Sequence, residues 1–366
     1  MLLSTRVKDR DNHFNLMRLV AATMVLFSHG ASLIGVKPAF EPDSHGYIFT
    51  LGSMAVNIFF VVSGFLVTGS LVQRRDLVGF VWARALRIFP GLWVMLALTV
   101  LLLGPALTSH GVAAYFGDPA TSDYFLHCAT LIGGMRFYLP GVFETNAFDQ
   151  MVNRSLWTLP LEWRMYEYLA VAWAVFGLFG AGREKFLRWL APLLAATGFA
   201  VAAQAQAAEG LFDLGATNSY MFCAGACFYL FRDRIVLARL YFCAPLAALA
   251  LALADPRLFF YAYLALLPLI VIQFAYARCD RLLGFNRRGD TSYGVYIYSF
   301  PLQQLIVVAF PGLSLLAFEG LSLAATYAAA ALSWRLIEKP ALAKKEVFSA
   351  ATRALLRRPP PVSACG

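Results

Sequence analysis

Charged residues are scarce in this sequence. Only 14% of its 366 residues are Asp, Glu, Lys or Arg, whereas 60% are hydrophobic. A soluble domain usually carries about a quarter charged residues, because its surface has to be solvated. The composition therefore argues against a soluble enzyme, a disordered protein and a nucleic-acid-binding protein, and it predicts a protein with several membrane spans.

Cysteine patterns that mark metal sites or disulfide frameworks are also lacking. The six cysteines stand mostly inside apolar runs, without Cys-x-x-Cys spacing and without paired histidines. Cysteines in such surroundings behave as small apolar residues, so we expect neither a disulfide framework nor a metal. The first apolar run begins after Arg18 and has no small-x-small cleavage site, which favours a retained span over a removed signal peptide.

Ten segments read as membrane spans. A helix needs roughly 20 mostly apolar residues to cross about 30 Å of hydrocarbon. The segments are 15–35, 49–70, 80–104, 160–180, 187–207, 216–231, 238–254, 258–276, 290–311 and 315–337. We therefore predict an all-α, polytopic transmembrane helix bundle over residues 1–340. Residues 341–366, with three consecutive prolines, are expected to form a disordered cytoplasmic tail.

The basic residues predict the orientation of these spans. Lys and Arg favour the cytoplasmic side, and with a cytoplasmic N-terminus 25 of the 30 fall there. Both termini are then cytoplasmic, and the net charge of +9 needs no nucleic acid as a partner. Residues 105–159 become a long outer connection, which we interpret as a re-entrant or interfacial segment, with a pore-lining element as the alternative.

Two residues of the first span share one helix face. Eleven residues at about 100° each bring His29 back to the side of Arg18, about 16 Å along the axis. Charges inside spans are costly and therefore mark candidate functional sites. Because imidazole exchanges a proton near neutral pH, His29 is a candidate general base, with a structural hydrogen bond as the simpler alternative.

A pair of arginines opens the third span. Arg84 and Arg87 are three residues apart, so their guanidinium groups emerge on the same side of a helix. Guanidinium groups bind phosphate oxygens in a bidentate manner. The pair predicts a phosphate-binding site, and anchoring to lipid headgroups is the alternative.

Glu162 stands at the start of the fourth span. Pro160 suits the first turn of a helix, and the segment enters the membrane from the predicted outer side. This places the carboxylate at a depth similar to that of His29, where it could orient the imidazole. Capping of the helix and an ion pair with Arg164 are the alternatives.

Three further polar residues stand in spans where packing is the simpler interpretation. Asn57 precedes small residues that allow helices to approach closely, and Tyr293 and Tyr296 lie on one face of the ninth span before Pro301. Contact with a ligand is the alternative for all three.

In sequence order, these motifs resemble the acyltransferase-3 family of integral membrane acyltransferases. They are Arg18 with His29, the segment 57–65, Arg84-x-x-Arg87 before Ile-Phe-Pro90, Ser155-Leu-Trp157 with Glu162, Ser292-Tyr293-x-x-Tyr296, and Ile337-Glu-Lys-Pro340. The resemblance covers nearly the whole chain. It departs after Glu162, where many members have Glu-Gln instead of Trp-Arg, and at Ser299, where many have histidine.

The resemblance implies an O-acyltransferase that moves an acyl group, most often acetyl, from cytoplasmic acyl-CoA to a hydroxyl of a cell-surface or lipid-linked glycan. It implies a bacterial inner-membrane enzyme, surrounded by membrane lipid, that uses acetyl-CoA or another acyl-CoA and no metal. A transporter or flippase for a lipid-linked saccharide is the alternative function, and a non-catalytic scaffold is a third. The sequence has no obvious internal repeat of the kind that many transporters carry.

The resemblance also assigns roles to the residues singled out above. His29 matches an essential histidine, which Glu162 would assist in catalysis. The donor would be held by Arg18, Arg84 and Arg87. The candidates for substrate binding are Asn57, Trp157, Tyr293 and Tyr296.

Overall fold

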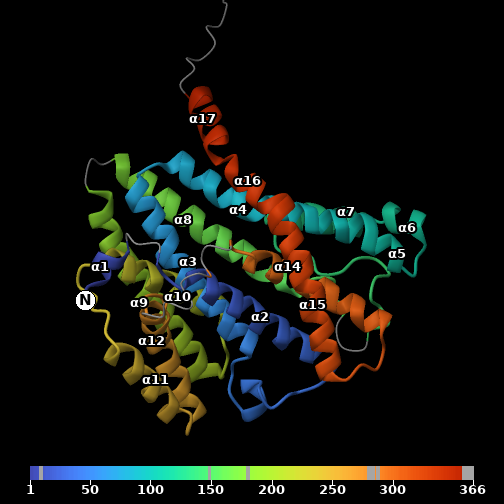
Figure 1. Ribbon diagram of the computed structural model, residues 1–366, viewed down its shortest axis with the longest axis horizontal. Helices are drawn as coiled ribbons and strands as arrows, with labels where there is room; N and C mark the ends of the chain where they lie inside the picture. Colours follow the sequence, from blue (N-terminus) through green and yellow to red (C-terminus); the bar gives the residue numbers. More distant parts are fainter. Residues whose placement is uncertain (8–10, 147–149, 179–181, 278–284, 286–288, 357–366) are drawn as a thin grey trace, which may run out of the picture.

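The computed structural model describes residues 1–7, 11–146, 150–178, 182–277, 285 and 289–356. Within these residues the secondary structure is helical and no β-strand is formed, so the predicted all-α fold is confirmed. Figure 1 shows the helices gathered into one bundle, from which the C-terminal helix projects.

Ten helices correspond to the ten predicted spans. They are α2 (Phe14–Leu33), α3 (Leu51–Arg74), α4 (Leu77–Leu98), α8 (Leu159–Leu178), α9 (Arg183–Glu209), α10 (Leu214–Leu230), α11 (Leu240–Ala252), α12 (Pro256–Ala275), α14 (Ser292–Ala309) and α15 (Leu315–Ser333). In the described part of the chain, six are long and apolar enough to cross a membrane, namely α2, α3, α4, α9, α12 and α15 with their continuations. The number of spans therefore stays a prediction.

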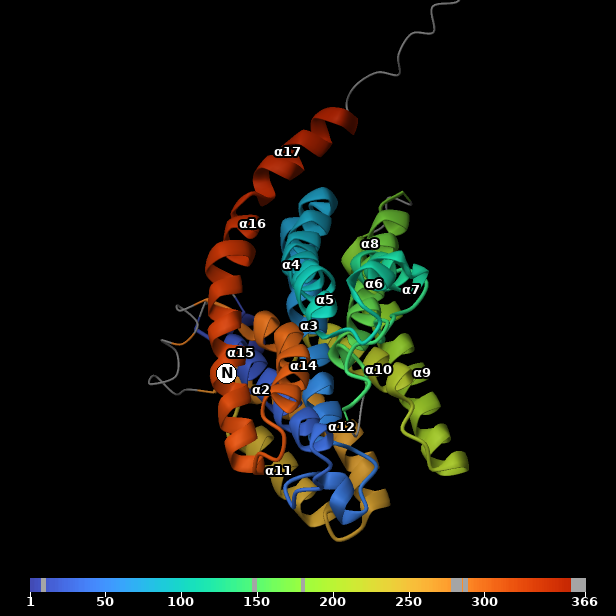
Figure 2. The ribbon, with the colours of Figure 1, turned by 90° about the vertical axis from the view of Figure 1, so that its right-hand side faces the viewer.

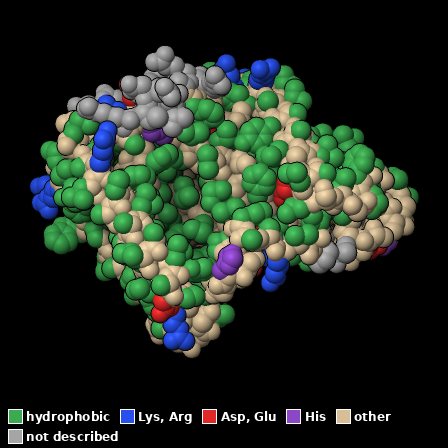
Figure 3. All heavy atoms as spheres, turned by 60° about the horizontal axis from the view of Figure 1, so that its bottom comes forward, with side chains coloured by type: hydrophobic (Ala, Val, Ile, Leu, Met, Phe, Trp, Pro, Cys, Tyr) green, Lys and Arg blue, Asp and Glu red, His purple; other side chains and the backbone are tan. Residues whose placement is uncertain are grey.

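The surface supports membrane embedding. Figure 3 shows a face covered largely by hydrophobic side chains, with the charged ones few and mostly near its edges. Leu178, Trp189 and Leu316 are each more than 80% exposed. Water-soluble proteins rarely leave apolar patches this extensive uncovered. The chain is an integral membrane protein.

Helices α3 and α10 make the closest contact in the bundle. A Cβ added at Gly64 of α3 would lie 1.9 Å from the backbone oxygen of Phe222, and one at Gly225 of α10 would lie 2.1 Å from that of Val61. Only glycine permits this approach. Helix α3 also packs against α2 and α12, so it forms one wall of the interior.

A second group of helices faces α2 from the other side. Helix α14 packs against both α2 and α15, and Figures 1 and 2 agree in placing these three side by side. Helix α4 continues through a π-helical turn (Thr99–Leu103) into α5 (Gly104–Leu107). Such turns are uncommon and often lie near functional sites.

Where the structure describes it, the connection after α5 contains only short helices. Helix α6 (Val112–Gly117) has 6 residues and α7 (Pro119–Thr130) has 12, too few to span a membrane. Helix α7 packs on α4, and Asn153 donates a hydrogen bond to the backbone oxygen of Ile297 in α14. The loop that leads into α8 is thereby fixed to the bundle.

The prediction of a disordered tail is wrong for residues 345–356. They form helix α17 (Lys345–Leu356), which follows α16 (Lys339–Ala343) and packs on α4. Trp82 stacks on Phe348 with ring centroids 4.7 Å apart, and Arg353 forms an ion pair with Asp76 at 2.5 Å. One apolar face is enough to dock this otherwise polar helix on α4. Residues 357–366 lie outside the described part of the chain.

Candidate active site

Three adjoining cavities run through the bundle between α2, α3, α8 and α14. We call them the arginine cavity, about 300 Å³, the central cavity, about 40 Å³, and the histidine cavity, about 160 Å³. The arginine and central cavities share Arg18, Ser63, Glu162 and Tyr293 as lining residues. The central and histidine cavities share Val56 and Tyr296.

Helix α2 reaches both ends of this row. Arg18 lines the arginine and central cavities, and His29 lines the histidine cavity. The predicted common face of Arg18 and His29 therefore has a counterpart in the row of cavities along α2.

Acidic residues already engage two of the three arginines. Asp290 accepts hydrogen bonds from Arg18 at 2.5 Å and from Arg87 at 2.7 Å, and Glu338 lies 3.3 Å from Arg87. The Asp290 carboxylate thus bridges the guanidinium groups of Arg18 and Arg87 and holds the two arginines in place.

Arg84 has different surroundings. Among the described residues it has no ion-pair partner, and its buried Nε atom has no hydrogen-bond partner. Its guanidinium carbon lies 6.0 Å from the centre of the Tyr166 ring, within range of a cation–π contact. Arg84 is thus the arginine of this cavity whose charge is least compensated.

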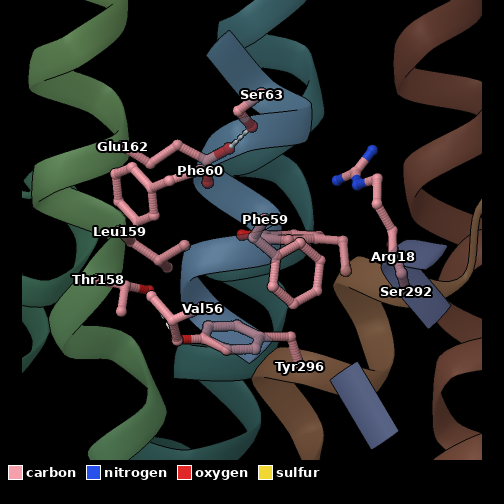
Figure 4. A pocket seen from close by; sticks show the side chains of 11 residues that line it. Arg18, Val56, Phe59, Phe60, Ser63, Thr158, Leu159, Glu162, Ser292 and Tyr296 are labelled. Atoms are coloured by element: carbon pink, nitrogen blue, oxygen red, sulfur yellow. Dashed lines mark hydrogen bonds between the residues drawn. The ribbon is translucent and has the colours of Figure 1, made fainter. Parts of the chain in front are cut away.

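Glu162 does not lie beside His29. Figure 4 shows Glu162 of α8 directed toward Ser63 of α3, with Arg18 on the opposite side of the cavity. Its carboxylate accepts hydrogen bonds from Ser63, at 2.9 Å, and from Tyr166. It lines the arginine and central cavities instead of the histidine cavity, so its predicted pairing with His29 is wrong.

The reason is depth along the helix. Ser155, whose hydroxyl reaches His29, lies in the 3-10 turn Arg154–Thr158, and Glu162 follows seven residues later in α8. Seven residues of helix advance the chain by about 10 Å. The alternative, an ion pair of Glu162 with Arg164, is not formed among the described residues either. The Arg164 side chain is exposed.

The histidine cavity combines an imidazole with several hydroxyl groups. His29 Nδ1 lies 3.3 Å from the Ser155 hydroxyl, and Phe300 meets the imidazole edge-on with ring centroids 5.2 Å apart. The polar or aromatic residues that line the cavity with His29 are Ser28, Ser32, Thr50, Ser53, Arg154, Trp157 and Tyr296. Hydroxyl, guanidinium and indole groups are suited to contact a sugar through hydrogen bonds and stacking.

The predicted substrate-binding residues separate in the structure. Trp157 lines the histidine cavity, and Tyr296 lies between that cavity and the central one, where its hydroxyl donates to the Ser155 backbone oxygen at 2.7 Å. Tyr293 lines the other two cavities and donates to the backbone oxygen of Ile88 at 2.7 Å.

Asn57 lies elsewhere. It is 1% exposed and donates to the Tyr263 hydroxyl of α12 at 2.9 Å, and it lines none of the three cavities. The structure supports its packing interpretation.

Sequence reasoning missed Asp290, Glu338, Ser63 and Tyr166. Glu338 was part of a recognised motif, and Asp290 stands two residues before another, so the scarcity of acids near the spans could have drawn attention to both. Ser63 and Tyr166 carry no such signal, because small hydroxyl residues and tyrosines are common in membrane helices. No group of three His, Cys, Asp or Glu suited to hold a metal ion occurs within the described residues.

Comparisons with known proteins identify the family. The family model of an acyltransferase domain, Acyl_transf_3, matches residues 11–335. The chain is 28% identical to an O-acetyl transferase of Shigella phage Sf6, over 90% of this chain and 96% of the phage protein. It is 30% identical to nodulation protein 10 of Rhizobium leguminosarum bv. viciae, over 90% of this chain and 93% of that protein. No solved structure matches the chain. The predicted resemblance is confirmed, and this integral membrane protein belongs to the acyltransferase-3 family of acyltransferases.

Proposed function

We propose that this acyltransferase moves an acyl group, acetyl in the simplest case, from acyl-CoA in the arginine cavity to a hydroxyl of a saccharide in the histidine cavity. The observation that carries the proposal is the row of three cavities with shared lining residues, with arginines at one end and His29 at the other. The named relatives support acetyl as the group transferred, since the phage protein is an O-acetyl transferase.

The donor would bind with its phosphates in the arginine cavity. This cavity is lined by Arg84 and Arg87 of α4 and by Tyr293 of α14, and basic residues are frequent in the sequence just before both helices. Since Lys and Arg favour the cytoplasmic side, this supports a cytoplasmic donor site, in a bacterial inner membrane under the proposal. Arg84 is the group available for a phosphate, because Asp290 and Glu338 already engage the others. The pantetheine arm would then extend through the central cavity, past Tyr296, toward His29.

The transfer step uses His29 as a base. In the tautomer that the mechanism uses, His29 donates its Nδ1–H to the Ser155 hydroxyl, and the lone pair on Nε2 takes the proton of the acceptor hydroxyl. The hydroxyl oxygen forms a bond to the thioester carbonyl carbon, and the carbon–sulfur bond breaks. The departing thiolate takes the proton back from the imidazolium, so that CoA leaves as a thiol and the base is regenerated.

The acceptor would enter from the opposite, outer side. Trp157 offers a flat surface for a sugar ring, and the surrounding serine and threonine hydroxyls offer both donors and acceptors of hydrogen bonds. A cell-surface or lipid-linked glycan is the acceptor class that this arrangement fits best.

The test is a transfer assay in membrane vesicles with labelled acetyl-CoA and isolated surface glycan. Substitution His29→Ala should lower transfer by about 10²–10⁴-fold, the range of general-base catalysis. The matched control is His110→Ala, because His110 is an exposed histidine of the loop before α6 that lines none of the three cavities. Undiminished transfer by His29→Ala at normal expression would remove His29 from the mechanism.

A further inference from the structure

Helix α15 buries a polar face. The residues buried along it are Phe318, Glu319, Ser322, Thr326, Ala330 and Ser333. Four of these six are polar, while leucines such as Leu316 and Leu332 are exposed. Since lipid surrounds the bundle, the polar face must serve something inside it.

Most of these polar groups lack partners. Glu319 is only 6% exposed, yet both of its carboxylate oxygens have no hydrogen-bond partner among the described residues. The same holds for the side-chain oxygens of Gln303, Ser322 and Thr326, each 0% exposed. Glu338, at the other end of the bundle, shows the usual arrangement, because Arg87 and Ser333 both bind its carboxylate. Native structures leave few buried polar atoms unsatisfied, and a lone buried carboxylate is especially costly.

Two of these side chains, those of Glu319 and Gln303, meet beside α2. A Cβ built on Gly30 would lie 2.4 Å from the Glu319 Oε1 atom and 2.6 Å from the Gln303 Nε2 atom, so both side chains reach the same place. Gln303 Nε2 donates to the Leu26 backbone oxygen at 2.9 Å, which leaves its carbonyl oxygen as the free atom. Ser322 is three residues from Glu319 on the same helix face, about 4.5 Å along the axis.

We propose that Glu319, Gln303 and Ser322 form a binding site for Na⁺ between α2, α14 and α15. The free atoms are all oxygens, the ligands that hard cations prefer. One carboxylate supplies one negative charge, which a monovalent ion neutralises and a divalent ion would exceed in an apolar setting. A proton would neutralise the carboxylate and satisfy at most two of these oxygens, and water would contact several oxygens but leave the charge, whereas Na⁺ neutralises the charge and contacts several oxygens at once. Thr326, about 10 Å from Glu319 along the helix, lies outside the site.

The site lies next to the proposed catalytic segment. Gly30 directly follows His29 in α2, and the Leu26 carbonyl that Gln303 binds is three residues before it. An ion bound here would join α14 and α15 to the part of α2 that carries His29. This inference does not depend on acyl transfer, because it concerns the stability of the helix packing.

The experiment measures the thermal unfolding of the purified full chain in detergent, in NaCl and in choline chloride of equal ionic strength. Na⁺ should raise the Tm of the wild type by about 2 °C for each tenfold increase above its dissociation constant, because a ligand of the native state stabilises it. Glu319→Gln, which keeps the shape and removes the charge, should abolish this dependence. The matched control is Glu346→Gln, an exposed acid of α17 with 77% side-chain exposure, which should respond to Na⁺ as the wild type does.

Ser322→Ala removes one ligand and keeps the charge, so it should shift the response to higher Na⁺ and provide a test if Glu319→Gln fails to fold. A wild-type Tm that is equal in Na⁺ and choline would overturn the proposal. So would an unchanged Na⁺ response in Glu319→Gln, or a Tm that depends on pH alone, which would assign the charge compensation to a proton.

Discussion

Arg84 and Arg87 are three residues apart on one face of α4, yet their surroundings give them different properties. Arg87 is held by Asp290 and Glu338, whereas Arg84 has no acidic partner among the described residues. A guanidinium that already satisfies two carboxylates is poorly placed to bind a third anion, and one that faces a tyrosine ring remains available. We therefore propose a structural role for Arg87 and a binding role for Arg84.

We predict opposite phenotypes for the two arginines. Arg84→Gln should raise the KM for acyl-CoA with little loss of stability. Arg87→Gln should leave the buried Glu338 without a charged partner and Asp290 with Arg18 alone, and the loss of a buried ion-pair partner typically costs about 3–5 kcal/mol. Steady-state kinetics and thermal unfolding of both variants check this. An Arg87→Gln protein of normal stability with a raised KM would contradict the division of roles.

Single residues could be predicted from the sequence where their interactions lie within one helix, and not where they join segments far apart in the chain. Arg18 and His29 could be related because one helix fixes both, and its periodicity is known. The pairing of Glu162 with His29 could not be judged, because it depends on how far α8 has advanced past Ser155, the residue that contacts His29. Asp290 was missed because its partners, Arg18 and Arg87, are 272 and 203 residues away in the sequence.

At the scale of elements, the contact of α3 with α10 depends on two glycines. We predict that Gly64→Ala or Gly225→Ala destabilises the protein by about 1–3 kcal/mol, because the new Cβ would overlap a backbone oxygen that only a shift of the helices can move. Gly320→Ala in α15 is the control, since nothing lies within 4 Å of its added Cβ. Thermal unfolding of the three variants provides the comparison. Equal stability of all three would mean that the helices separate without cost.

Helix α17 depends on an ion pair that responds to pH. Burial tends to raise the pKa of Asp76, but the hydrogen bond and charge of Arg353 outweigh it, and the pKa is lowered. A lowered pKa in the docked state stabilises docking above the ordinary value, near 4, and this contribution is lost as the pH falls through the lowered pKa. We therefore predict that α17 is docked at neutral pH and loosens in acid.

Hydrogen exchange of residues 345–356 measures this docking. Arg353→Gln should speed exchange at neutral pH and remove the acid dependence, whereas Lys344→Gln, at an exposed position just before α17, should behave as the wild type. An acid dependence that persists in Arg353→Gln would assign it to another group. The helix itself was not foreseen, because the proline tract that follows it suggested disorder for the whole tail.

At the scale of the whole molecule, composition and charge distribution were enough to predict a polytopic helical membrane protein, since both follow from the lipid environment. The row of cavities could not be predicted in this way. It arises where α2, α3, α8 and α14 meet, and the two residues that line both the central and the histidine cavity, Val56 and Tyr296, come from different helices. Val56 has no charge and was not among the residues singled out from the sequence. Tyr296 was singled out in the ninth span, but packing was its simpler interpretation.

In the proposed reaction the acyl group has to pass the wall that Val56 and Tyr296 share between the central and histidine cavities in order to reach His29. We predict that Val56→Phe, which adds bulk to the shared wall, blocks transfer of labelled acetyl while acyl-CoA still binds to the arginine cavity. Val56→Ala, which removes bulk at the same position, should retain transfer and serves as the control for altered packing. Binding is measured by equilibrium titration with acyl-CoA and transfer by label in the glycan. If Val56→Phe transferred acetyl as the wild type does, the donor would have to reach His29 by another path. The central and histidine cavities would then not form one route for the acyl group.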